Sequence, residues 1–202
     1  MSDDTKDSTD PNDPNNSVKA HLLASLRFHR EVLIWKLDGL SEYDIRRPLT
    51  VTGTNLLGLV KHAATWEARY FGEVFGRPFP EPIQPWQEAD GSDLWVRADE
   101  TRDEIIAFYG RAAQHADATI ETLSADTPGH VPWWPEPETT LINILIHMLL
   151  DINRHAGHAD ILREGLDGRT GGAAKYEEPI NAAAREAHFA TVEAAAQQVL
   201  DH

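Results

Sequence analysis

Apolar residues recur along the chain at the three- and four-residue spacing of amphipathic helices, with polar residues on the opposite faces. This pattern predicts four long helices, over residues 17–39, 54–76, 101–123, and from Thr139 or Thr140 to the glycines that follow Glu164. A further amphipathic stretch, residues 179–199, predicts a fifth helix. No stretch alternates between apolar and polar residues as a half-buried strand does, so no strand is predicted.

Polar residues at the helix starts agree with these boundaries. Ser17 is a residue type that caps the first turn of a helix, and Thr101 with Glu104 forms the capping-box pattern T-x-x-E. Prolines make residues 77–97 and 126–138 predicted irregular connections. Four long helices with two long connections favour an all-α four-helix bundle with an additional C-terminal helix.

The first 16 residues differ in composition from the rest, since they are almost entirely Asp, Ser, Thr, Asn and Pro. A segment with so little apolar surface cannot offset the entropy lost on ordering. Residues 1–16 are therefore predicted to be a disordered acidic tail, and residues 17–202 a single domain. The polar start lacks the apolar core of a signal peptide, and no apolar run reaches the roughly 18 residues that span a bilayer. A cytoplasmic protein is the expectation.

Charge and cysteine content argue against several classes of function. The net charge of −15 argues against nucleic acids and anionic membranes as partners, because neutralising phosphates requires clustered Lys and Arg. The chain has no cysteine, which excludes disulfides, thiolate zinc sites and a cysteine nucleophile. Any thiol chemistry must therefore use a thiol that a substrate brings in.

The predicted fourth helix carries a stripe of side chains that can bind metals. His147, Asp151 and His155 follow one another at intervals of four, and His158 comes three residues later, so all four lie along one side of the helix. Asp151 and His155 fall nearest its apolar arc. Burying a carboxylate beside an imidazole is costly unless the two share a proton, a partner or a metal ion. The stripe predicts either a hydrogen-bonded Asp–His pair or a metal site.

His62 on the predicted second helix favours the metal site. It lies near the edge of the apolar arc of that helix, and with Asp151 and His155 it can supply three N or O ligands. Three protein ligands and one open position are the arrangement of catalytic zinc sites. A purely structural role for this histidine is the alternative.

Glu67 projects from the middle of the same apolar arc. A carboxylate in such a position usually pairs with an arginine or orients a metal-ligating histidine. Arg154 is the candidate partner, and a Glu that reaches solvent is the alternative. Four tryptophans are candidates either for the wall of a pocket or for plain core packing: Trp35, Trp66, Trp133 and Trp134.

The chain resembles the DinB superfamily in two segments, HMLLDINRHAGHADILREGLDGRTG and LVKHAATWEARYF. It is most similar to the actinobacterial branch that includes mycothiol-dependent S-transferases and the metal-binding domain of mycothiol-dependent maleylpyruvate isomerase. The resemblance spans residues 17–172 and implies a DinB-like helical bundle that binds a divalent metal. It places His62, Asp151 and His155 at the metal-ligating positions.

The same resemblance suggests roles for the neighbouring residues. Many relatives have His or Glu where this chain has Asp151, whose shorter side chain keeps the charge but changes the reach. Many have Gln at the position of His158, which is therefore expected beside the metal and not on it. Glu67 and His158 are the candidate catalytic residues, which tune the metal or move protons. Trp66 and Arg154 are candidate contacts for the cofactor.

Residues and resemblance together favour a metal-dependent S-transferase that joins a low-molecular-weight thiol of the mycothiol type to a small electrophile. Zinc is the favoured metal because it suits a four-coordinate N/O site, and nickel is the alternative. A metal- or small-molecule-binding stress protein without turnover and a metal-assisted hydrolase need the same three ligands, and both stay open. A homodimer also stays open.

Overall fold

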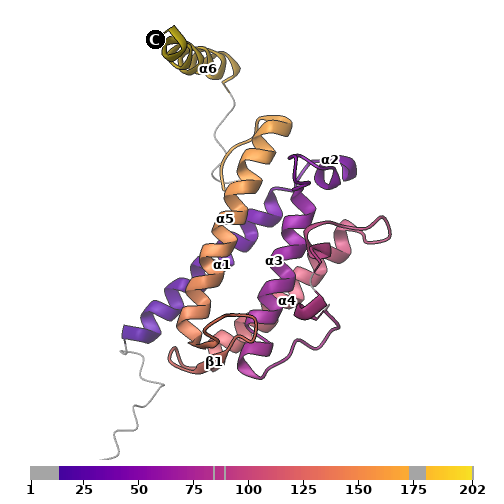
Figure 1. Ribbon diagram of the computed structural model, residues 1–202, viewed down its shortest axis with the longest axis vertical. Coiled ribbons are helices and arrows are strands. Elements are labelled where there is room, and N and C mark those ends of the chain that lie inside the picture. Colours follow the sequence, from indigo (N-terminus) through magenta and orange to yellow (C-terminus); the bar gives the residue numbers. More distant parts are fainter. Residues whose placement is uncertain (1–13, 84, 89, 173–180, 202) are drawn as a thin grey trace, which may run out of the picture.

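The computed structural model describes residues 14–83, 85–88, 90–172 and 181–201, and four long helices dominate it (Figure 1). They are α1 (Pro14–Trp35), α3 (Leu56–Tyr70), α4 (Arg102–Thr122) and α5 (Leu141–Asp167). The remaining helical segments are α2 (Glu42–Arg46), α6 (Ala182–Gln197), η1 (Glu73–Phe75), η2 (Trp86–Glu88), η3 (Ser92–Leu94) and η5 (Gln198–Asp201). The predicted all-α bundle is confirmed, although the five-residue α2 was not predicted.

The helices pack so that α3 contacts both α4 and α5, whereas α1 packs mainly against α5. They enclose one apolar core, because each helix carries its apolar residues on the face toward its neighbours. The core residues that α3 and α5 contribute are almost completely buried and include Leu57, Val60, Ala64, Leu145, Met148 and Ile152. A polar side chain at the contact between α3 and α5 therefore lies beside this core.

Hydrogen-bonding side chains fix the starts of α3 and α4. Thr101 and Glu104 form the predicted capping box at α4. The N-cap of α3 is Asn55, one residue later than predicted, and its side-chain oxygen accepts a hydrogen bond from the Gly58 N–H at 2.8 Å. The Asn55 amide also donates to the Leu94 carbonyl at 3.2 Å. The residue that begins α3 thus also holds the connection that leads toward α4.

The prediction that the chain has no strand is wrong at one place. β1 (Pro128–His130) pairs antiparallel with β2 (Glu138–Thr140). Strands of three residues are too short to show an alternating pattern, and the prolines around them argue for a loop. The pairing closes the loop that carries Trp133 and Trp134 and joins it directly to the start of α5.

The two ends of the chain differ from the prediction in detail. α1 begins at Pro14, three residues before the predicted start, and residues 1–13 of the predicted tail lie outside the described residues. α6 falls within the predicted fifth helix, but none of its described side chains is buried, and Figure 1 shows it apart from the bundle. The bundle core is therefore complete without α6.

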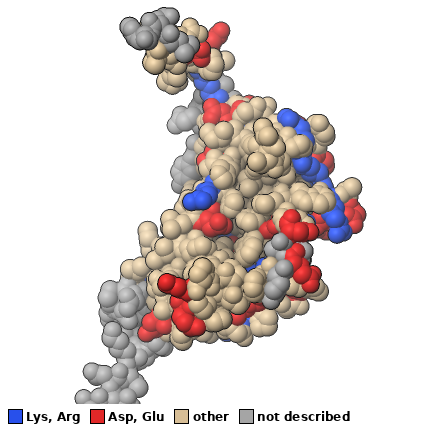
Figure 2. All heavy atoms as spheres, in the orientation of Figure 1, with Lys and Arg blue, Asp and Glu red and all other residues tan. Residues whose placement is uncertain are grey.

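Charged side chains are dispersed over the face of the molecule that Figure 2 shows. On the face in Figure 2, acidic and basic residues are interspersed with large uncharged areas. The basic side chain of α2, Arg46, pairs with Glu42 at 3.0 Å. The helices within the described ranges include none with the length and apolar character of a membrane span.

Candidate metal centre

The three predicted metal ligands meet at the contact between α3 and α5. His62 projects from α3, and Asp151 and His155 come from successive turns of α5. One donor atom from each lies within 4.8 Å of the others, and the two imidazole rings are 4.7 Å apart between centroids. We refer to these three residues as the His–Asp–His cluster. Its side chains are 17%, 31% and 13% exposed, so a small ligand can reach a site that is largely inside the bundle.

The spacing inside the cluster is long for a hydrogen bond. Nε2 of His155 is 3.5 Å from Oδ2 of Asp151, at the outer limit for such a bond. Ligand atoms on adjacent corners of a tetrahedron around zinc lie about 3.3–3.6 Å apart when the bonds are roughly 2.0–2.2 Å. The buried Nδ1 of His155 also has no hydrogen-bond partner among the described residues. The spacing suits two ligands of one ion better than a closed Asp–His pair.

A further residue, Asp93, orients His62. Nδ1 of His62 donates a hydrogen bond to Oδ2 of Asp93 at 2.7 Å, and the indole N–H of Trp66 donates to the same oxygen at 2.9 Å. A carboxylate on Nδ1 holds the proton on that nitrogen and leaves Nε2 as the free donor atom. Sequence reasoning missed Asp93, because it lies in a proline-rich connection without periodicity.

Close packing against α3 places Asp93. It belongs to η3, and the carbonyl of the next residue, Leu94, lies directly over Gly58. Any Cβ at position 58 would clash with that carbonyl oxygen. Lys61 secures the same segment, since its ammonium group donates to the Trp95 carbonyl at 3.2 Å. The position of Asp93 thus depends on a glycine in α3.

Both acids of the site are held in their charged form. Burial alone would raise the pKa of Asp93, but the hydrogen bonds from His62 and Trp66 outweigh it, and the pKa lies below its usual value. Burial acts in the same direction on the pKa of Asp151, and the neighbouring imidazoles, with His155 first, again lower it overall. Two neutral imidazoles and one carboxylate carry a charge of about −1, so a divalent ion among them would keep a net positive charge.

Aromatic side chains line the contact between α3 and α5 beyond the cluster. The ring of Trp66 lies 5.7 Å from that of Trp133, and the ring of Tyr70 lies 4.9 Å from that of His147, between centroids. Trp134 is 5.0 Å from His147 in the same way. Three of the four tryptophans considered from the sequence therefore gather beside the cluster.

The other tryptophan and His158 lie outside this group. Trp35 is buried elsewhere, with its ring centroid 4.6 Å from Nζ of Lys36. His158 is exposed on α5, and its ring is 5.8 Å from that of His155. This distance puts His158 next to the cluster without making it a member.

The prediction that Glu67 pairs with Arg154 is wrong. The carboxylate of Glu67 is completely buried and forms its ion pair with Arg30 of α1, while Arg154 is exposed on α5. Arg30 also binds Asp117 of α4 at 2.7 Å, so this group ties three helices together. Burial raises the pKa of Glu67 even though Arg30 opposes it. The partner was missed because helix periodicity does not show which helices become neighbours.

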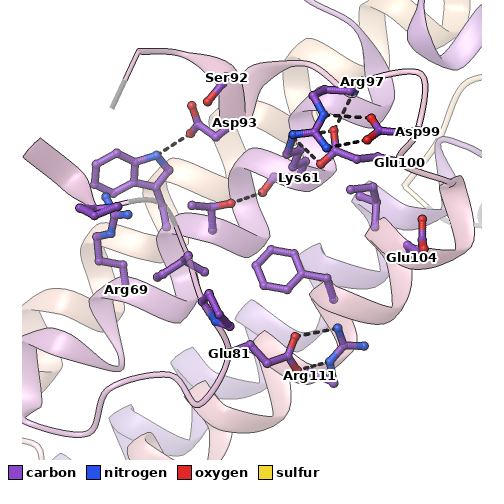
Figure 3. Close-up of a pocket in the computed structure, with 17 residues that line it drawn as sticks. Lys61, Arg69, Glu81, Ser92, Asp93, Arg97, Asp99, Glu100, Glu104 and Arg111 are labelled. Carbon is purple, nitrogen blue, oxygen red and sulfur yellow. Dashed lines mark hydrogen bonds and ion pairs between the residues drawn. The ribbon is translucent and has the colours of Figure 1, made fainter. Parts of the chain in front are cut away.

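A cavity of about 630 Å³ borders Asp93 (Figure 3). Asp93 and Trp66 are among its described lining residues, whereas no member of the His–Asp–His cluster is. Its charged groups largely neutralise one another in the pairs Lys61–Glu100, Arg97–Asp99 and Arg111–Glu81. Those charges are paired with one another, whereas donor atoms of His62, Asp151 and His155 converge within 4.8 Å, so the cluster is the stronger candidate for a metal site.

Comparison with known proteins adds one match. A family model described as Mycothiol-S-transferase matches residues 21–168. The matched stretch covers most of the chain and includes the whole cluster, Asp93 and the aromatic residues around them. A search among curated proteins finds no match.

Proposed function

The chain belongs to the mycothiol S-transferase family, and on this premise we propose that it joins a low-molecular-weight thiol of the mycothiol type to a small electrophile with the help of a divalent metal ion. The family match supports an enzyme of this type. The observation that carries the metal part of the proposal is the convergence of His62, Asp151 and His155. We propose zinc as the ion, with nickel as the alternative.

The residues present fit such an ion. Zinc in catalytic sites is commonly held by three N or O ligands with one position left open, and the cluster offers that number and kind. Nε2 of His62 is available because Asp93 binds the other ring nitrogen. When bound, the ion would supply one function, which is to favour the deprotonated form of a thiol in its open position.

Side chains around the cluster orient a proposed ligand and provide a path for the thiol proton. Asp93 holds the His62 ring in the tautomer that presents Nε2, and Trp66 restrains Asp93 by binding the same oxygen. We propose His158, at the exposed edge of the cluster, as the carrier that passes the thiol proton to solvent. The sulfur then attacks the electrophilic carbon, and the electron pair of the broken bond leaves with the leaving group or moves within the electrophile.

The other predicted residues have less direct parts in this proposal. Trp66 and Arg154 remain proposed contacts for the thiol cofactor, Trp66 from α3 and Arg154 from the exposed side of α5. Glu67, which is sealed against Arg30, is proposed to act by holding α3 in place, and not by meeting the substrate.

Elemental analysis followed by a conjugation screen tests the function on the full chain. We expect stoichiometric divalent metal, and thiol-dependent consumption of bromobimane or chlorodinitrobenzene that stops on chelation and returns with zinc. Protein that binds no divalent ion under any loading condition contradicts the proposal. Metal-dependent hydrolysis without thiol would indicate a hydrolase, and bound metal without either activity would indicate a binding protein.

A further inference from the structure

Two matching stripes of side chains run along the contact between α3 and α5. Each is spaced by four residues, and they comprise His62, Trp66 and Tyr70 on α3 and His147, Asp151 and His155 on α5. The rings of His62 and His155 are 4.7 Å apart, and those of Tyr70 and His147 are 4.9 Å apart. Residue numbers increase along α3 in the direction in which they decrease along α5, so the two helices are antiparallel. The two ring pairs are therefore about 12 Å apart along the helix axes. Helical side chains lean toward the N-terminus of their own helix, so Tyr70 leans toward the cluster.

The hydroxyl of Tyr70 already uses its whole capacity as an acceptor. The indole N–H groups of Trp133 and Trp134 both donate to it, each at 3.1 Å. A hydroxyl has two lone pairs and one hydrogen to donate, so the O–H is all that remains for a further partner. Tyr70 is only 6% exposed, and no acceptor among the described residues takes this hydrogen. A buried donor in this state is costly unless a ligand completes it.

The surroundings keep this donor neutral and polarised. Burial has the largest influence and raises the pKa of Tyr70 above its usual value, although the two indole hydrogen bonds oppose it. The hydroxyl is therefore protonated at neutral pH. The two N–H groups draw electron density away from the oxygen, which strengthens its O–H as a donor.

We propose that Tyr70 donates a hydrogen bond to the oxygen atom of the electrophile that receives the electron pair when the thiol sulfur attacks. This inference rests on the S-transferase function proposed above and adds a preference for electrophiles whose developing charge falls on oxygen, such as α,β-unsaturated ketones. There the S–C bond forms as the C=C π bond breaks, its electron pair forms the new double bond between the α-carbon and the carbonyl carbon, and the C=O π pair moves to the oxygen beside Tyr70. The thiol proton goes to solvent, and a solvent proton later adds to the α-carbon.

An alkyl bromide provides the contrast that tests the inference. Its C–Br bond breaks and the electron pair leaves on bromide, so no oxygen needs a donor. In full-length, metal-loaded protein, Tyr70→Phe should lower kcat about 100-fold with cyclohexenone and change it little with benzyl bromide. Tyr43→Phe alters a tyrosine that is 74% exposed and should leave both rates unchanged. Trp134→Phe keeps the hydroxyl but removes one of its two indole donors, and it should reduce the cyclohexenone rate by less.

A binding measurement gives a readout that does not depend on turnover. The purified cyclohexanone conjugate of the thiol should bind metal-free Tyr70→Phe about 5-fold more weakly than metal-free wild type, whereas the benzyl conjugate should bind both alike. If Tyr70→Phe folds poorly, Trp134→Phe replaces it. This variant should also weaken binding of the cyclohexanone conjugate more than that of the benzyl conjugate, but by a smaller factor.

The possible results separate this inference from the function on which it rests. Equal losses with both electrophiles, or no loss with cyclohexenone, would mean that Tyr70 only packs and would overturn the inference alone. Wild-type protein that conjugates neither of these electrophiles, nor bromobimane or chlorodinitrobenzene, would overturn the S-transferase function and the role of Tyr70 with it.

Discussion

Two groups of polar side chains lie inside the bundle, both contain residues of α3, and they differ in how completely their charges are paired. In the first group the buried Glu67 meets Arg30, and Arg30 also binds Asp117, so each charge has an opposite charge beside it. In the second group one carboxylate, Asp151, lies among imidazoles at distances that close no strong hydrogen bond. Asp93 leaves the Nε2 of His62 free, and the Nε2 of His155 is 3.5 Å from Asp151.

The contrast shows how a structural group can be told from a site that awaits a ligand. A buried ion pair is tolerated when its members satisfy each other, and removing one member leaves a buried charge without compensation. A cluster whose donor atoms converge but do not bind one another is costly unless a ligand completes it. The first group should therefore matter for folding alone, and the second for ligand binding above all.

Removing Glu67 should have the largest effect on stability. Glu67→Ala leaves the guanidinium of Arg30 buried without its partner from α3 and should cost roughly 3–5 kcal/mol in the free energy of unfolding. Chemical denaturation measures this value. The double variant Arg30→Met, Glu67→Leu removes both charges and should be more stable than Glu67→Ala; if it is less stable, the pair is worth more than an apolar contact.

Removing His155 should have a large effect on metal binding and a small effect on the stability of the metal-free protein. His155→Ala takes away one of three proposed ligands and should abolish tight metal binding, while the metal-free protein loses little stability. The stabilisation by zinc, about 2.7 kcal/mol when the free ion is 100 times its Kd, should disappear. Melting curves with and without zinc, together with metal analysis, measure both effects. His158→Ala is the matched control and should retain its metal; loss of the ion in that variant would move His158 into the ligand set.

Neutralising Asp93 should weaken metal binding without removing a metal ligand. Asp93→Asn keeps the shape of the side chain but removes the charge that polarises His62, and we expect metal affinity to fall about 10- to 100-fold. Competition with a chelator of known affinity measures the change. Asp99→Asn, at an exposed acid of the same cavity, should leave the affinity unchanged. Equal affinities for wild type and Asp93→Asn would show that Asp93 merely fastens the loop.

A methyl group at position 58 should disturb the hydrogen bond between Asp93 and His62 indirectly. Gly58→Ala directs a Cβ at the Leu94 carbonyl and should shift the segment that carries Asp93, so metal affinity should fall although every ligand is intact. Gly110→Ala is the matched control, since it is also within a helix but its Cβ would meet nothing within 4 Å. It should leave metal binding unchanged and gain up to about 1 kcal/mol from helix propensity.

The smallest expected effect concerns His147 and pH. Burial lowers the pKa of His147 in the folded protein, with the charge of Asp151 opposing. The unfolded chain therefore binds the proton more readily as pH falls below about 6.5, and by linkage the folded state loses stability in that range and regains it at higher pH. His147→Phe should flatten this dependence. Unfolding curves at pH 5.5 and pH 8 measure it, and identical pH slopes for the two proteins would contradict the assignment.

The long helices could be predicted because burial of one face leaves a periodic record in the sequence. Caps that use adjacent residues, such as Thr101 with Glu104, are likewise local signals. The strands β1 and β2 could not be predicted, since three residues show no period and their pairing depends on residues that are distant in the chain. The position of α6 outside the core also depends on what surrounds a helix, and not on its own pattern.

The residues of the candidate site also fall into those that local sequence could predict and those that it could not. Asp151 and His155 could be paired from their spacing, because one helix fixes both, and His62 followed from its place near an apolar arc. Asp93 could not be found, because an irregular connection brings it to His62. The partner of Glu67 was misjudged for a related reason: Arg30 and Arg154 are equally plausible until the neighbours of α3 are known.

The separation of the cluster residues along the chain has a consequence for folding kinetics. His62 and Asp93 can meet once α3 and the connection after it have formed, whereas bringing His62 to His155 closes a loop of about 90 residues. We therefore expect the full set of donor atoms to form only once α5 has docked. An ion that needs all three should leave the refolding rate unchanged and slow unfolding. It would lengthen the lifetime of the finished bundle without helping it to form.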